Sequence, residues 1–145
     1  MSKSNAFETS LLNHIFKNLV IANIGDATGL PAAATAGSLY VALHTADPGE
    51  TGTQIVSEAT YTSYARVAVV RGAGWTVAGN QVSNAAATAF PVCTAGTNTI
   101  THFSIGTASS GAGNLLYSGS ITPSLAVSIG ITPNFPIGSL VITED

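Results

Sequence analysis

The segment 38–50 constrains the fold of this chain most tightly, because it encodes one strand followed by an abrupt end. Apolar side chains alternate with their neighbours from Leu39 to His44, which is the period-two pattern of a β-strand. The tripeptide Asp47-Pro48-Gly49 follows directly. Proline cannot donate to a strand ladder and glycine adopts backbone conformations that other residues resist, so the strand must end there. We take this strand as the first of an all-β core.

Short apolar runs separated by turn residues continue to the end of the chain. We expect further strands at residues 64–71, 75–78, 81–84, 88–91, 97–105, 115–121, 125–131 and 138–143. Gly79-Asn80 is a favoured two-residue turn, so the runs on either side of it should form a hairpin. About eight short strands at this spacing predict one all-β domain, a β-sandwich or a jelly roll.

A single helix is expected at residues 5–24, with Asn5 as its N-cap and Glu8 completing a capping box. Its apolar positions form a wide band on one side. Such a band can pack on the chain's own sheet or on a neighbouring subunit, and the sequence leaves both open. We therefore divide the chain into a helix and linker arm at residues 1–37 and a β-sandwich domain at residues 38–145.

Charged residues are scarce: they make up 8% of the 145 residues, with four basic and seven acidic side chains. So few cations cannot neutralise many phosphates, which argues against a nucleic-acid partner. The low charge suits a surface that other subunits partly cover. No run of about 18 apolar residues is present, so we expect no membrane span.

Metal and cofactor sites are not predicted. Cys93 is the only cysteine, so no intramolecular disulfide can form. Three histidines (His14, His44 and His102) each lie on a different predicted element, whereas a zinc site needs its ligands clustered. A trimer could still bring three copies of one histidine to its axis. The segments 72–74 and 111–113 are Gly-Ala-Gly turns that lack the remaining residues of a phosphate loop.

Catalysis is not predicted either. The chain has no Gly-x-Ser-x-Gly motif, and the neighbouring His44 and Asp47 are better explained as a solvated turn. Glu50 and Glu58 share a long loop and could in principle act as a glycosidase pair, but nothing distinguishes them from solvated residues. Four aromatic residues could form a carbohydrate-binding platform, although strand aromatics more often fill a core: Tyr40, Tyr61, Tyr64 and Trp75.

Several segments together resemble a family of small tailed-bacteriophage virion proteins, often labelled tail-fibre proteins, some of which are similar to capsid decoration (cement) proteins. The most specific piece is Leu39-Tyr40-Val41-Ala42-Leu43-His44-Thr45-Ala46-Asp47-Pro48-Gly49. Weaker pieces are an N-terminal helix, Tyr64-Ala65-Arg66, the segments 99–105 and 114–119, and the ending 135–143. The resemblance spans most of residues 5–143.

This resemblance implies a β-rich virion structural protein, assembled in the host cytoplasm, that is a homotrimer and not an enzyme. A receptor-binding fibre usually carries a long repetitive shaft, which this chain lacks. Our leading expectation is therefore a cement protein that binds the major capsid protein and stabilises the head. The alternative is a small tail-fibre or baseplate component, or a receptor- or carbohydrate-binding tip.

Overall fold

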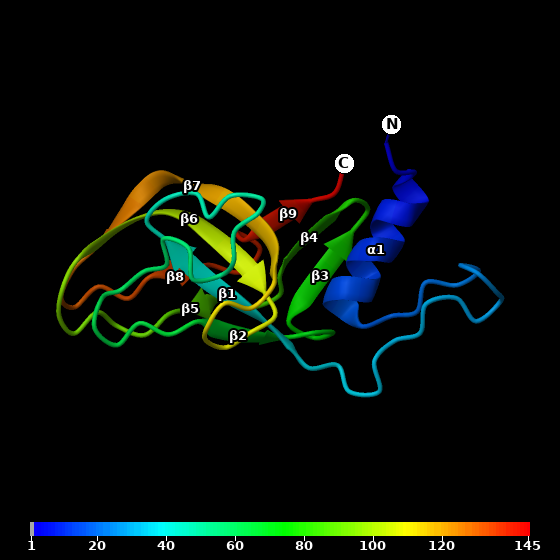
Figure 1. Ribbon diagram of the computed structural model, residues 1–145, viewed down its shortest axis with the longest axis horizontal. Coiled ribbons are helices and arrows are strands. Elements are labelled where there is room, and N and C mark those ends of the chain that lie inside the picture. The colour runs from blue at the N-terminus through cyan, green and yellow to red at the C-terminus, as the bar shows by residue number, and fades with distance from the viewer. Residues whose placement is uncertain (1) are drawn as a thin grey trace. The chain divides into compact units, whose positions relative to one another are not determined.

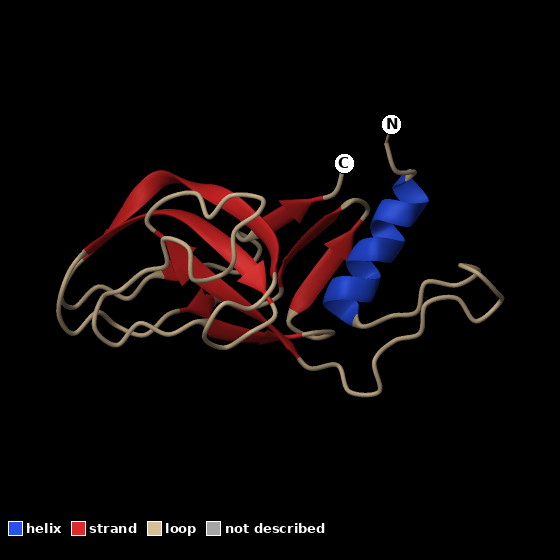
Figure 2. Ribbon diagram, in the orientation of Figure 1, coloured by secondary structure: helices blue, strands red, loops and turns tan. Residues whose placement is uncertain are grey.

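The computed structural model describes residues 2–145, which form one helix and nine short strands arranged in three antiparallel sheets (Figures 1 and 2). This confirms the expected all-β core with an N-terminal helix. In chain order the elements are α1 (Asn5–Lys17), β1 (Ser38–His44), β2 (Val67–Val70), β3 (Trp75–Ala78), β4 (Gln81–Asn84), β5 (Thr88–Ala89), β6 (Asn98–Gly106), β7 (Leu115–Val127), β8 (Asn134–Phe135) and β9 (Val141–Thr143).

The four-stranded sheet has the order β2-β1-β6-β7, with β1 and β6 in its interior. Alternation along β1 matches its antiparallel register with β6, in which Val41 lies opposite Ile105 and Leu43 opposite Phe103. All four side chains are buried, and both strands lie in the interior of the sheet with a neighbouring strand on each side. Strand β1 ends at His44, shortly before the predicted stop.

The N-cap of helix α1 lies one residue before the expected N-cap, and the helix ends at Lys17, seven residues before the expected end. Ser4, not Asn5, is the N-cap: its hydroxyl accepts a hydrogen bond from the Phe7 N–H at 3.3 Å. The helix ends where Asn18 adopts a left-handed conformation with φ of 58°. The prediction that the helix extends to residue 24 was wrong. The apolar periodicity continues beyond Asn18, but the left-handed conformation of Asn18 ends the helix.

The buried face of α1 packs on the sheet that has the order β3-β4-β9. Leu12 and Phe16 are fully buried, and the Phe16 ring meets the Trp75 ring edge-on with 4.8 Å between centroids. Arg71 then caps the helix: its guanidinium donates to the carbonyls of His14 and Ile15, two of the last carbonyls of α1. Part of the wide apolar band therefore packs within the chain's own fold, whereas Phe7, Leu19 and Val20 stay exposed.

Three strand predictions need correction. The expected strand 64–71 is shorter, because Tyr64 and Arg66 turn into a polar cluster and β2 starts at Val67. The expected strands 115–121 and 125–131 are one strand, β7, that continues through Pro123. Proline is tolerated there because β7 lies at the edge of its sheet. Strand β8 was not predicted, and it pairs with β5 in a two-stranded sheet.

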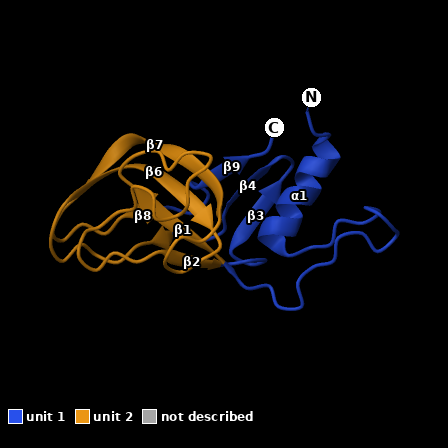
Figure 3. Cartoon of the chain, viewed as in Figure 1, with its two compact units in different colours: residues 1–38, 70–87, 135–145 blue, residues 39–69, 88–134 orange. Residues whose placement is uncertain are grey.

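The described chain divides into two compact units (Figure 3). Unit 1 comprises residues 1–38, 70–87 and 135–145, and unit 2 comprises residues 39–69 and 88–134. Each is therefore assembled from separated stretches of sequence. The expected division of the chain into an arm at residues 1–37 and a β-sandwich at residues 38–145 stays a prediction.

Within unit 1, residues 22–37 form an exposed arm between α1 and β1 (Figure 1). The Asn18 side chain pairs with the backbone of Ala33 in both directions, each hydrogen bond measuring 2.9 Å. Ile21 and Leu30 exchange backbone hydrogen bonds at 2.9 and 3.1 Å. These bonds give the base of the arm a defined conformation although nearly all of its side chains are exposed.

The substitution Phe16→Ala should lower the free energy of unfolding by about 3–5 kcal/mol, because it removes a fully buried ring and leaves a cavity beside Trp75. Urea denaturation followed by tryptophan fluorescence would measure this loss. Phe7→Ala is the matched control on the same helix, since the Phe7 side chain is 38% exposed. Equal losses in both variants would contradict the packing described for α1.

Candidate functional site

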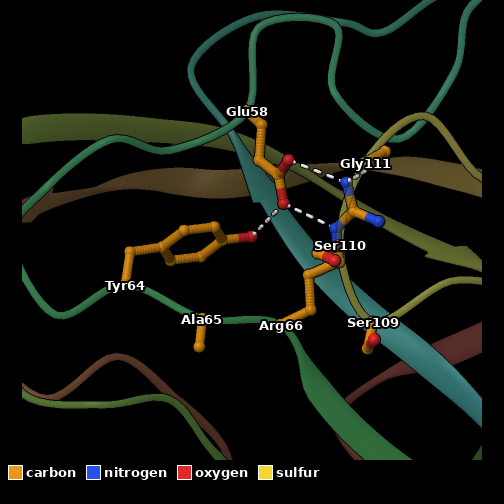
Figure 4. Close-up of a pocket in the computed structure, with 7 residues that line it drawn as sticks. All are labelled: Glu58, Tyr64, Ala65, Arg66, Ser109, Ser110 and Gly111. Atoms are coloured by element: carbon orange, nitrogen blue, oxygen red, sulfur yellow. Dashed lines mark hydrogen bonds and ion pairs between the residues drawn. The ribbon is translucent and has the colours of Figure 1, made fainter.

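A polar hollow with a volume of about 250 Å³ lies in unit 2 (Figure 4). It forms where the loop after β1, the segment before β2 and the loop between β6 and β7 come together. Its lining residues are Glu58, Tyr64, Ala65, Arg66, Ser109, Ser110 and Gly111. Figure 4 shows the Glu58 carboxylate between the Tyr64 hydroxyl and the Arg66 guanidinium.

Arg66 organises this hollow, and its side chain is 2% exposed. Its Nε and Nη2 donate to the two carboxylate oxygens of Glu58 at 2.7 and 2.8 Å, which is the bidentate geometry that an arginine fork favours. Nη1 donates to the Gln54 side chain at 3.3 Å and to the Ala108 carbonyl at 2.9 Å, and Nη2 also reaches the Gly111 carbonyl at 2.7 Å. All five guanidinium donors therefore have acceptors inside the protein.

The hydrogen-bond acceptors of the cluster, the Glu58 carboxylate and the Tyr64 oxygen, also have partners within the protein. Glu58 Oε1 also accepts the Tyr64 hydroxyl proton at 3.0 Å, and the Tyr64 oxygen accepts from the Leu43 N–H at 3.0 Å. Burial raises the pKa of Tyr64, so this phenol stays protonated and keeps donating to Glu58. The Glu58 hydrogen bond raises the pKa of Arg66, which keeps the guanidinium charged.

Gln54 extends the cluster into the protein interior. Its side chain is fully buried, with Nε2 donating to the Tyr40 carbonyl at 3.2 Å and Oε1 accepting from the Ala108 N–H at 3.1 Å. Gly106 and Gly113 lie against this amide, so a Cβ added to either would come within 2.1 or 2.6 Å of Gln54 atoms. The two glycines flank the β6–β7 loop, and their lack of a side chain lets it close over Gln54.

His44 forms a second buried polar contact in the same unit. Its ring is fully buried, with Nδ1 at 2.8 Å from the Val56 carbonyl and Nε2 at 2.7 Å from the Ser104 hydroxyl. A carbonyl can only accept, so Nδ1 carries the proton and Nε2 accepts from Ser104 in the neutral imidazole. Burial lowers the pKa of His44, which favours this neutral form.

The other residues weighed from the sequence do not gather into a site. Cys93 is buried and His102 lies on β6 with its ring at 2.9 Å from the Thr101 hydroxyl, while His14 lies on α1. Among residues 2–145, no three His, Cys, Asp or Glu side chains are placed to hold a metal ion. The expectation that the chain has no catalytic, cofactor or metal residues stays a prediction. No helix in this part of the chain combines the length and apolar character of a membrane span.

Two interpretations made from the sequence change, that of Glu58 and that of His44 with Asp47. Glu58 is an ion-pair partner and not a solvated loop residue, whereas Glu50 is exposed as expected. His44 is buried, so it does not form a solvated turn with Asp47, whose carboxylate accepts from the Gly49 N–H instead. The aromatic side chains form no exposed row: Trp75 and Tyr61 are buried, and Tyr40 and Tyr64 are half-buried.

Sequence reasoning missed Gln54 and the role of Arg66. The available signal was an arginine at the start of a strand in a chain with only four basic residues. A buried cation needs a partner, and Glu58 is the nearest acidic residue in the sequence before it. The amide of Gln54 and the carbonyls of the β6–β7 loop carry no such signal.

The family model described as Podophage GP4 fiber I protein gp80 matches residues 2–143. The chain belongs to this family. No curated protein matches it.

Family membership confirms the predicted class: the chain is a phage virion component and a structural protein, not an enzyme. It also corrects the order of our two functional expectations. The matched family is a fibre family, so a fibre role is favoured over capsid decoration.

The variant Arg66→Ala should lower the free energy of unfolding by about 3 kcal/mol or more, because it leaves the largely buried Glu58 carboxylate without its cation. Arg66→Lys should recover only part of this loss, since an ammonium cannot reproduce the bidentate fork. Equilibrium denaturation measures both variants. Arg66→Lys matching the wild type would show that charge alone suffices.

The pH dependence of stability should report His44. Its pKa is lowered in the folded state from the ordinary value of 6.5, so the unfolded chain binds the proton more readily. The folded state is therefore favoured above pH 6.5 and loses this advantage as the pH falls below that value. His44→Gln should reduce the difference in melting temperature between pH 7 and pH 5.

Proposed function

We propose that this protein is a structural component of a phage fibre that acts as a homotrimer and binds other virion proteins. The observation that carries the proposal is the family match over residues 2–143, which covers almost the whole chain. A match of this extent concerns the entire fold rather than one shared motif. The protein would then contribute rigid β-structure and contact surfaces, and no chemistry, to the virion.

The chemistry of the hollow supports a structural role. Its guanidinium donates to internal acceptors at all five positions, so it has no donor left for an anionic ligand. Its lining contains neither histidine nor cysteine, and its one carboxylate, Glu58, is engaged by Arg66 and Tyr64, which leaves Ser109 and Ser110 without a free base to activate them. The cluster is best explained as a structural one that holds together the loop after β1, the segment before β2 and the β6–β7 loop of unit 2.

The distribution of charge supports a homotrimer and contacts with other virion proteins. No Asp, Glu, Lys or Arg occurs between Arg71 and Glu144, which is about half of the chain. A free protein normally keeps charges spread over its surface to remain soluble. A long uncharged stretch that forms seven strands, β3 to β9, suits surfaces that become buried between subunits.

The exposed arm at residues 22–37 and the segment 18–21 that joins it to α1 offer a contact for another virion protein. Large aliphatic side chains remain exposed on and beside it: Leu19, Val20, Ile24 and Leu30. Asp26 is the only charged residue in the arm. An ordered segment that buries little in its own unit while exposing aliphatic groups is typical of a docking element.

Gold-labelled antibodies raised against the purified protein should decorate fibres on intact virions of the phage that encodes it. Light scattering after size exclusion should give three times the monomer mass. Antibody bound evenly over the head would contradict the fibre assignment and restore capsid decoration. A monomer at micromolar concentration would contradict the homotrimer while leaving the location of the protein to the labelling result.

A further inference from the structure

The strand β7 forms one edge of the four-stranded sheet in unit 2 (Figures 1 and 2). It is 13 residues long, and within residues 2–145 its one neighbouring strand is β6. Along an antiparallel strand, alternate residues direct their backbone N–H and C=O groups to opposite sides. The side of β7 that faces away from β6 is therefore a template for another strand.

Natural proteins usually protect such an edge with charged side chains, proline or a bulge. The first half of β7, residues 115–121, contains neither a charged residue nor proline, and Pro123 comes only afterwards. Residues 117–120 pair with β6 in regular register, without a bulge. Its exposed side chains at Ser118 and Ser120 are small, so a second backbone can approach closely.

The opposite edge of the same sheet is β2, whose one neighbour within the described chain is β1. This strand contains no charged residue. The arginines on either side of it, Arg66 and Arg71, use their guanidinium groups within the protein and so do not repel a second strand. Arg66 donates to Glu58 and to internal carbonyls, while Arg71 donates to the carbonyls of His14, Ile15 and Ala36. Both edges of the sheet thus lack the electrostatic repulsion that would keep two copies apart.

An exposed aliphatic cluster follows β7 directly. Ile129, Ile131 and Val92 are 71%, 40% and 42% exposed. Two backbone hydrogen bonds of 2.9 Å bring their segments together, from the Cys93 N–H to the Ile131 carbonyl and from the Gly130 N–H to the Cys93 carbonyl. This cluster would gain free energy from burial at about 25 cal/mol per Å² of apolar area, beside whatever the strands gain by pairing.

We infer that β7 of one copy pairs edge to edge, antiparallel, with β2 of a second copy of this chain. A strand can pair with its own equivalent only around a two-fold axis, so a three-membered ring needs two different edges that meet head to tail. The sheet supplies those two edges as β7 and β2. The inference rests on the proposed homotrimer and names the strands that hold it together.

Cysteine pairs across the interface test this inference. Ala68 and Val69 point to opposite faces of β2, so one of them shares a face with residues 116, 118 and 120 of β7. Each of Ala68→Cys and Val69→Cys is combined in turn with Leu116→Cys, Ser118→Cys or Ser120→Cys, giving six double variants. We expect at least one combination to yield disulfide-linked trimers on non-reducing gels after oxidation. The native Cys93 is buried and present in every variant, so any cross-link that it forms would appear equally in all of them and in the wild type.

The matched control places the second cysteine at Thr99, which is exposed but lies on the interior strand β6. Combined with Ala68→Cys or Val69→Cys it should give no linked species. A wild-type trimer in which none of the six combinations forms cross-links would overturn the β7–β2 pairing but leave the homotrimer standing. Linked dimers from Ser118→Cys alone would show instead that β7 pairs with β7 around a two-fold axis. A monomeric wild type would contradict the homotrimer itself.

Discussion

The buried guanidinium of Arg66 is the interaction on which unit 2 depends most. A cation with 2% exposure is tolerated only when its charge and its donors are satisfied, and here Glu58 supplies the charge. The remaining acceptors are the Gln54 amide and the carbonyls of Ala108 and Gly111, so a single side chain fastens two loops that are distant in sequence. Gly106 and Gly113 are required because any side chain there would collide with Gln54.

Arg71 performs the corresponding task in unit 1. It donates to the carbonyls at the end of α1 and to Ala36 in the arm, which joins helix and arm to the start of the β3–β4 hairpin. The two arginines flank β2, and each is used by its own unit. After Arg71 the chain has no further charged residue until Glu144, so β3 to β9 are held mainly by apolar burial and neutral hydrogen bonds, with one charged donor, Lys17, reaching the Trp75 carbonyl of β3.

The small number of charged residues connects the fold with its function. The charged groups at the hollow are used internally, so the hollow offers little to a ligand. Uncharged edges, exposed aliphatic residues and an ordered arm are the surfaces left for contact with other molecules. Those are the features expected of a virion structural protein, whose work is to be joined to its neighbours, and they agree with membership of a phage fibre family.

The sequence by itself determined the local elements: alternation fixed β1 and β6, and Gly79-Asn80 fixed the β3–β4 hairpin. It also determined the class of protein, through segments whose order resembles phage virion proteins. Only the tertiary structure decided that Pro123 lies within β7, that α1 stops at Lys17, and that Glu58, Arg66 and Gln54 meet. The physical reason is that periodicity and turn chemistry act over a few residues, whereas edge position and partners for a buried charge depend on segments far apart in the chain.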